Sequence, residues 1–239
     1  MIVDAAVDRV VYPGPPAPAS YTSSPAWLRR LQQSKQPCCF AACTESKPSE
    51  RLYVFMHGNA DCLVSWQRTG LLQRFSKDLG CDCMLLSYPG YPLCAPARAH
   101  GAARDAETVS KLVLALQEAQ RRYNNVWLAG HSIGCAMALA CCAHFRASGL
   151  LLMSPFDSLR NMAAREYGSV GAWAVGQRFN NVAAACHVRC PVIIIHGSND
   201  EVVPEQHSLR LFKALPTNAL KHRFIVAGMG HALASMYVP

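Results

Sequence analysis

The pentapeptide Gly-His-Ser-Ile-Gly at residues 130–134 lies between an apolar run at 126–129 and a stretch of small and apolar residues at 135–145. This succession predicts a strand, a tight turn and a helix. In a G-x-S-x-G turn the serine is strained, and the two glycines keep neighbouring strand and helix atoms from colliding with it. The chain is therefore expected to expose Ser132 at the carboxyl end of a strand.

A serine hydroxyl is a weak nucleophile near neutral pH, so this turn indicates catalysis only if a histidine base and a carboxylate follow it. Asp200 follows the β-branched run at 191–196, which is typical of a strand buried on both faces. His231 follows the run at 223–227, after two glycines that let the backbone turn. The order of these residues predicts Ser132 as nucleophile, Asp200 as acid and His231 as base.

Other carboxylates and histidines compete for these roles. Glu201 adjoins Asp200, and Asp157 also follows a strand, the apolar run at 150–154. Asp200 is favoured because its loop leads directly into a helix and lies one strand before His231. His131 is expected to shape the turn, and the remaining candidates are interpreted as surface or packing residues: His144, His207 and His222.

A second turn supplies a candidate oxyanion site. The run at 52–56 predicts a strand, and it ends in His-Gly-Asn-Ala-Asp at residues 57–61. Backbone N–H groups in such a turn and at the start of the helix after the serine stabilise an oxyanion. Asn59 and Ile133 are the expected donors, with Ala60 as the alternative to Asn59.

These features resemble the α/β-hydrolase superfamily from about Arg51 to His231. The chain is most similar to the α/β-hydrolase-domain depalmitoylases and the serine-aminopeptidase-like group. The motifs that carry this resemblance are His57-Gly-Asn, Gly130-x-Ser-Ile-Gly134, Ser154-Pro155 and His196-Gly-x-x-Asp200-Glu-Val, with a proline-rich stretch at 12–21. The resemblance implies an α/β-hydrolase fold and hydrolysis of fatty-acyl thioesters on protein cysteines, without cofactor or metal.

The chain departs from the depalmitoylase pattern in three places. It begins Met-Ile-Val-Asp and has no cysteine before Cys38, whereas those enzymes carry an acylated cysteine cluster at the N-terminus. Residues 87–92 read Ser-Tyr-Pro-Gly-Tyr-Pro where the family has Asp-x-x-Gly-Tyr-Gly. Eight residues follow His231, so a truncated C-terminal helix is expected.

Length and periodicity predict one α/β domain. Short β-rich runs alternate with helical stretches such as 102–122, which favours a mostly parallel, twisted sheet with helices on both faces. Residues 51–239 are expected to form this domain, and residues 1–50 an irregular arm with one or two short strands. The segment at about 157–185 predicts a short cap.

Charge, hydrophobicity and cysteine content indicate which classes of partner and which compartment to expect. The net charge of +8 is spread along the chain without a nucleic-acid motif, which favours a solvated basic face. If the charge serves an acidic partner, an anionic membrane surface is the expected one. No apolar run approaches the length of a membrane span, which favours a cytoplasmic protein, peripheral at membranes. The twelve cysteines are interpreted as free thiols, and the Cys-His-x-x-Cys at 186–190 as too little for zinc.

The expected substrate is an acyl ester or thioester, carried by a protein or a lipid. Long acyl chains are expected to be preferred, because Trp127, Met153, Phe156 and Trp173 are predicted to rim an apolar site. Two alternatives stay open: a non-catalytic interaction module, and a serine peptidase or lipase of the same fold. The sequence carries no signal for an oligomeric state.

Overall fold

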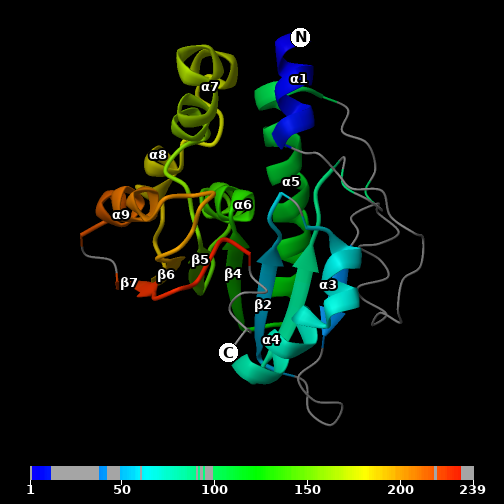
Figure 1. Cartoon of the computed structure of the whole chain (residues 1–239). Helices are drawn as coiled ribbons and strands as arrows, with labels where there is room; N and C mark the ends of the chain where they lie inside the picture. The colour runs from blue at the N-terminus through cyan, green and yellow to red at the C-terminus, as the bar shows by residue number, and fades with distance from the viewer. Residues whose placement is uncertain are drawn as a thin grey trace.

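The computed structural model describes residues 2–11, 38–41, 49–59, 61–89, 91, 94, 99–217 and 220–232. Within them a seven-stranded sheet has the order β1-β3-β2-β4-β5-β6-β7 (Figure 1). Its strands are β1 (Cys38–Ala41), β2 (Arg51–Met56), β3 (Asp82–Leu86), β4 (Asn125–His131), β5 (Gly149–Met153), β6 (Val192–Gly197) and β7 (Lys221–Val226). The helices are α1 (Ile2–Val11), α3 (Leu63–Thr69), α4 (Leu71–Leu79), α5 (Gly101–Gln120), α6 (Ile133–Cys141), α7 (Leu159–Val175), α8 (Asn181–Ala185) and α9 (Glu205–Ala214).

The sheet is parallel from β3 across to β7, and only β1 runs antiparallel, at the edge beside β3. Parallel strands need crossover connections, and helices supply them here. As a result the carboxyl ends of β2, β4, β5 and β6 meet at one edge of the sheet. The predicted mostly parallel α/β-hydrolase architecture is confirmed.

Helices cover both faces of the sheet. On one face α3 and α4 bury an aromatic cluster built around Phe55, Trp66 and Phe75. On the other face α5, α6, α8 and α9 enclose the larger core, and every side chain of α6 except Ala140 is buried. Each buried aliphatic or aromatic side chain contributes about 1.5–3 kcal/mol, so these two layers supply most of the driving force for folding.

Helix α6 and strand β6 differ from what the sequence predicts, the helix in its end and the strand in its burial. The helix after the serine turn ends at Cys141 rather than Phe145, because residues 142–144 form a turn. Strand β6 is not buried on both faces: Ile193 and Ile195 are half-buried, since it lies one strand from the edge. The edge strand β7 exposes its side chains further, with Phe224 53% exposed.

The predicted arm contains two elements of the fold. Strand β1 joins the sheet, and α1, which the sequence did not anticipate, packs on α5 and α7. Asp8 of α1 is 2% exposed; its carboxylate lies 2.9 Å from Arg178 Nη2 and accepts from the Gly101 N–H at 3.2 Å. The proline-rich stretch at 12–21 and the expected truncated C-terminal helix fall outside the described residues.

The predicted cap segment holds α7, which extends beyond the carboxyl edge of the sheet (Figure 1), and α8, which packs on α6 and α9. Gly168 interrupts α7 with φ 63° and ψ −154°. None of the described helices combines the length and the apolar character needed to span a bilayer.

The first turn of α6 lies against the end of β2 so closely that it leaves no room for a side chain. A Cβ atom on Gly134 would sit 2.0 Å from the Met56 carbonyl oxygen, whereas one on Gly230 would have its nearest neighbour at 3.9 Å. We expect Gly134→Ala to lower the free energy of unfolding by at least about 3 kcal/mol, because backbone atoms must separate. Gly230→Ala should stay within about 1 kcal/mol. Urea unfolding of both variants measures the difference, and similar losses would contradict the packing described.

Candidate functional site

Ser132 occupies the turn between β4 and α6 with φ 54° and ψ −118°. This backbone conformation is strained for a residue with a side chain, and such strain concentrates at functional sites. A Cβ on Gly130 would lie 2.5 Å from the Gly134 carbonyl, so both glycines of the motif are required by close contacts. The turn therefore holds the half-buried Ser132 at the carboxyl edge of the sheet, as the motif predicts.

The backbone around Ser132 is fixed from two sides. Its N–H donates to the Met153 carbonyl of β5 at 3.0 Å, and its own carbonyl accepts from Cys135 at 3.0 Å. Ile133 is the first residue of α6, so its N–H has no acceptor within the helix and lies beside Ser132. Ser132 Oγ makes no hydrogen bond to any residue that the structure describes.

Asp200 and His231 lie in direct contact at the same edge. His231 Nδ1 is 2.9 and 3.0 Å from the two carboxylate oxygens of Asp200. Asp200 also accepts from the backbone N–H groups of Val202 and Val203, at 3.1 and 2.8 Å. Burial alone would raise the pKa of Asp200, but hydrogen bonds from His196, His231 and Val203 hold it well below its usual range. The carboxylate is therefore ionised at neutral pH.

Two further histidines hold this pair in position. His196 is fully buried; its Nε2 donates to the Val203 carbonyl at 2.7 Å and lies 3.4 Å from Asp200. His131, next to Ser132, donates from Nε2 to the His231 carbonyl at 2.8 Å, and the two rings are 4.9 Å apart. Thus the serine turn and the loop of His231 are joined through His131.

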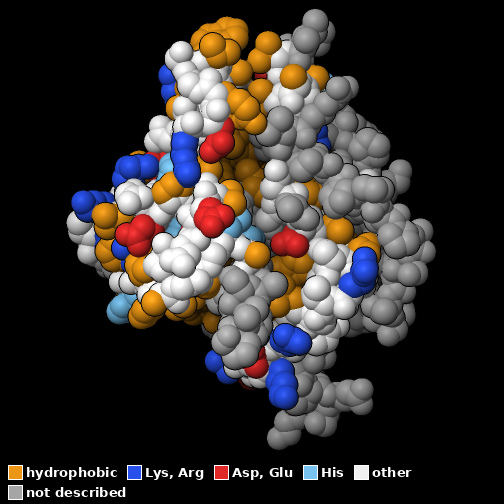
Figure 2. Space-filling model, in the orientation of Figure 1, with side chains coloured by type: hydrophobic (Ala, Val, Ile, Leu, Met, Phe, Trp, Pro, Cys, Tyr) orange, Lys and Arg blue, Asp and Glu red, His pale blue; other side chains and the backbone are white. Residues whose placement is uncertain are grey.

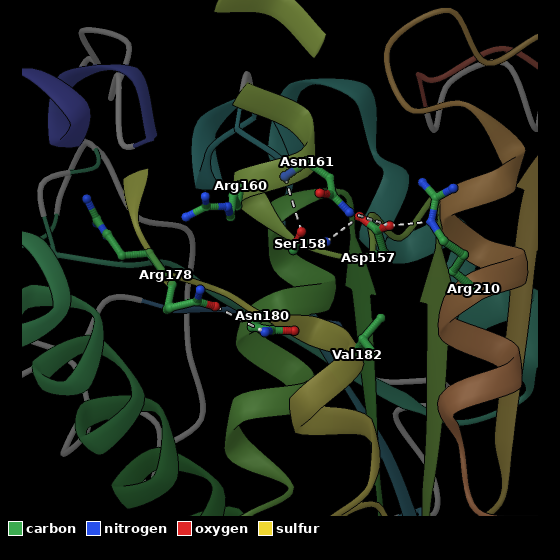
Figure 3. A pocket seen from close by; sticks show the side chains of 9 residues that line it. Asp157, Ser158, Arg160, Asn161, Arg178, Asn180, Val182 and Arg210 are labelled. Atoms are coloured by element: carbon green, nitrogen blue, oxygen red, sulfur yellow. Dashed lines mark hydrogen bonds and ion pairs between the residues drawn. The ribbon is translucent and has the colours of Figure 1, made fainter. Parts of the chain in front are cut away.

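The competing acid Asp157 is occupied elsewhere (Figure 3). Its carboxylate accepts from His207 at 2.7 Å, from Asn161 at 2.9 Å and from Arg210. Burial alone would raise the pKa of Asp157, but these bonds hold it well below its usual range. It lines a separate pocket of about 360 Å³ at the base of α7 and does not contact His231.

One expectation about the histidines changes with these contacts. His207 is 5% exposed and pairs with Asp157, so it is more than a surface or packing residue. Glu201 is exposed, and in the described structure only its backbone carbonyl is bonded, as the acceptor from Arg165. His144 and His222 are exposed on the surface.

The turn after β2 is held by two tyrosines. Tyr91 Oη donates to the Asn59 side-chain oxygen at 2.7 Å, and Tyr88 Oη donates to the His57 carbonyl at 2.9 Å. Asn59 is half-buried at the carboxyl end of β2, which lies beside β4. Ala60, the alternative donor, falls outside the described residues.

His57 anchors this turn as a neutral imidazole. Its Nδ1 donates to the Gly58 carbonyl at 2.8 Å, so its Nε2 accepts from Ser87 Oγ at 2.9 Å. Complete burial lowers the pKa of His57 from 6.5 to about 4. Ser87, the serine that departs from the depalmitoylase pattern, thus has a defined partner.

The predicted acyl rim is wrong for three of its four residues. Met153 and Phe156 are 1% and 3% exposed and belong to the core, because Met153 packs in the aromatic cluster under α3 and α4 and Phe156 in the larger core on the other face. Trp127 stacks on Tyr53 with ring centroids 5.4 Å apart, near the amino end of β4 and away from Ser132. Trp173 is exposed, as the prediction requires, but it lies on α7.

Sequence reasoning missed several residues around the candidate site. Tyr91 and His196 stand inside motifs that were noticed, yet only the folded structure shows that they hold Asn59 and Asp200. Asp61 is another: burial raises its pKa, a hydrogen bond from Ser65 opposes this, and it interacts electrostatically with His231. The described residues hold no cluster of three or more His, Cys, Asp or Glu side chains suited to a metal ion.

Comparison with known proteins gives a family and relatives at low identity. The Phospholipase/Carboxylesterase family model matches residues 94–238. The α/β hydrolase domain-containing protein aho-3 of Caenorhabditis elegans is 28% identical over 193 residues, which are 80% of this chain and 56% of that protein. Human α/β hydrolase domain-containing protein 17B is 26% identical over 219 residues, 87% of this chain and 69% of that protein. The chain thus matches little more than half the length of aho-3.

Solved structures share the fold at lower identity. Est1E from Butyrivibrio proteoclasticus, with ferulic acid bound, superposes with a TM-score of 0.66 at 15% identity, covering 82% of this chain and 87% of that one. The Paleococcus ferrophilus monoacylglycerol lipase gives 0.57 at 16% identity, covering 83% and 91%. At such identities the likeness establishes the fold alone.

The two neutral histidines at this edge make stability depend on pH. Burial lowers the pKa of His57 and of His131 from 6.5 to about 4, so between these values the unfolded chain binds more protons and stability falls as the pH falls. Between pH 7 and pH 5, proton binding by each of these histidines in the unfolded chain should lower the free energy of unfolding by about 2 kcal/mol.

Urea unfolding at the two pH values measures this loss. His57→Gln should lose about 2 kcal/mol less than the parent chain across the interval, whereas His144→Gln, at an exposed histidine, should behave like the parent. Equal losses in all three proteins would show that His57 does not titrate abnormally.

Proposed function

Because this chain belongs to the phospholipase/carboxylesterase family of α/β-hydrolases, we propose that it is a serine hydrolase with Ser132, His231 and Asp200 as its catalytic triad. The observation that carries the proposal is the contact of an ionised Asp200 with His231, whose loop is joined through His131 to the strained turn at Ser132. The carboxylate fixes the Nδ1–H tautomer of His231 and leaves Nε2 free to accept a proton.

The proposed reaction is a two-step acyl transfer. Ser132 Oγ attacks the ester or thioester carbonyl carbon while His231 Nε2 accepts the hydroxyl proton. The backbone N–H groups of Ile133 and Asn59 stabilise the oxyanion. His231 then returns the proton to the leaving alcohol or thiol, and a water molecule hydrolyses the acyl-serine by the same steps.

The proposed substrate class is a fatty-acyl thioester on a protein cysteine. The motif resemblance to the depalmitoylases and the similarity to the α/β hydrolase domain-containing proteins support it. An acylated lipid or another ester of the same chain length is the alternative within this chemistry. The non-catalytic alternative loses weight because Ser87, the main departure in the motifs, is bonded to His57.

Substitution of the two buried aspartates distinguishes the proposed catalytic role of Asp200 from the structural role of Asp157. We expect Asp200→Asn to lower kcat for a p-nitrophenyl ester by about three to four powers of ten, because the amide no longer fixes the His231 tautomer. Asp157→Asn should instead lower stability and leave the remaining folded enzyme with kcat within about threefold of the parent.

Ser132→Ala sets the baseline of this experiment. It should abolish labelling by a fluorophosphonate probe and reduce ester turnover to the Asp200→Asn level or below. If Ser132→Ala is labelled as strongly as the parent, or if Asp157→Asn is the more damaging change to kcat, the proposed triad is incorrect.

Acyl-chain length tests the substrate class. Each methylene that the enzyme buries contributes about 0.8 kcal/mol, so four additional carbons should raise kcat/KM by about two powers of ten. A series of thioesters from acetyl to palmitoyl on one thiol leaving group measures this, and we expect the maximum at long chains. A maximum at acetyl or butyryl would leave only a general esterase.

A further inference from the structure

Helix α7 folds back on itself and forms a projecting tip. After the break at Gly168, a Cβ on Gly171 would lie 2.6 Å from Tyr167 Cβ and 2.7 Å from the Ala163 carbonyl oxygen. Residues eight apart in a continuous helix are about 12 Å apart along its axis, so the second half of α7 packs across the first. The absence of side chains at Gly168 and Gly171 makes this sharp reversal possible.

The tip exposes apolar side chains to an unusual degree. Tyr167, Val170 and Trp173 are 67%, 73% and 73% exposed, the three highest values among the large hydrophobic residues that the structure describes. Every residue from 164 to 170 is exposed. Figure 2 shows hydrophobic surface at the top of the molecule, where α7 lies in Figure 1. A group of large apolar side chains so fully in water marks an interaction surface.

The residue types indicate a lipid partner. Tyr and Trp have apolar rings with a polar end, which suits the headgroup level of a bilayer, and here they flank a valine. The surface projects instead of forming a groove, so it can enter a soft interface without a matching cavity. On the same hairpin Arg165, 44% exposed, lies 3.8 Å from the carboxylate of Glu166, which offsets its charge. The charge that favours anionic headgroups is therefore the net +8 of the whole chain.

We propose that the tip of α7, formed by Tyr167, Val170 and Trp173, is a docking surface that inserts into the interface of a bilayer containing anionic lipids. Helix α7 leaves the carboxyl end of β5, the strand that pairs with β4 just before Ser132. Docking therefore turns the candidate site toward the lipid surface. The supply of a membrane-borne acyl chain to Ser132 rests on the proposed function. The docking itself does not depend on that function.

Vesicle binding tests the docking surface directly. The full chain is sedimented with unilamellar vesicles of phosphatidylcholine alone or of phosphatidylcholine mixed with phosphatidylserine. Val170→Ser/Trp173→Ser should weaken binding to the mixed vesicles at least about tenfold, because two apolar side chains are no longer buried in lipid. Arg165→Gln should weaken binding to the mixed vesicles only, by about fivefold.

Matched controls separate this surface from general stickiness and from catalysis. Leu114→Ser/Leu220→Ser removes two side chains that are 64% and 66% exposed on other elements and should change binding less than about twofold. Ser132→Ala should bind vesicles like the parent, and Val170→Ser, at a tip residue outside the predicted acyl rim, should hydrolyse a soluble short-chain ester at the parental rate. If the parent binds vesicles but does not hydrolyse the ester, the proposed function is refuted and the docking surface stands.

Three results would overturn the proposal. The first is equal vesicle binding by the parent and Val170→Ser/Trp173→Ser, and the second is no vesicle binding by the parent. The third is concentration-dependent self-association of the parent that the same two substitutions abolish, which would make a second copy of the chain the occupant of the tip.

Discussion

The close contact between the start of α6 and the end of β2 is the constraint on which the candidate site depends. With Gly134 against the Met56 carbonyl, the helix can begin only if the chain turns sharply at Ser132. The same approach brings His131 against Gly58, where a Cβ would lie 2.7 Å from its ring. The turn that carries the serine and the turn that carries Asn59 are therefore one packed unit. Glycines at positions 58, 130 and 134 make this unit possible, and the strain at Ser132 is its energetic cost.

Buried charge organises the edge of the sheet into two similar but separate pairs. Asp200 with His231, and Asp157 with His207, are both carboxylate–imidazole contacts under 3.1 Å. They differ in their surroundings: the first pair is joined to the serine turn through His131, whereas the second is enclosed by Arg210 and Asn161. The donors around Asp157 come from α7 and α9, so its charge is held between these two helices. This pair ties α9 to the base of the cap.

The sequence predicts those parts of the fold that local rules determine. The turn at Ser132 can be predicted because close backbone contacts require the glycines on both sides of it. The position of Asp200 can be predicted because it follows the end of a β-branched run. The direction of a side chain at a strand end is not local, so Met153 and Phe156 were placed at a rim although they belong to the core. Contacts between distant segments, such as Asp8 with Arg178, leave no periodic signal. The roles proposed for Ser132, Asp200 and His231 come from the chemistry of these residue types and from their order in the chain.

The buried carboxylate of Asp8 makes the first helix part of the cap's foundation. Asp8 lies between the start of α5 and Arg178, which follows α7 and also binds Asp105 at 2.7 Å. Arg178 is only 8% exposed, and removing residues 2–11 would take one of its two described carboxylate partners away. The loss of a partner from a buried charge lowers the free energy of unfolding. Shortening the chain from its amino end would therefore loosen the anchoring of α7, more than 150 positions later, and with it the geometry above Ser132.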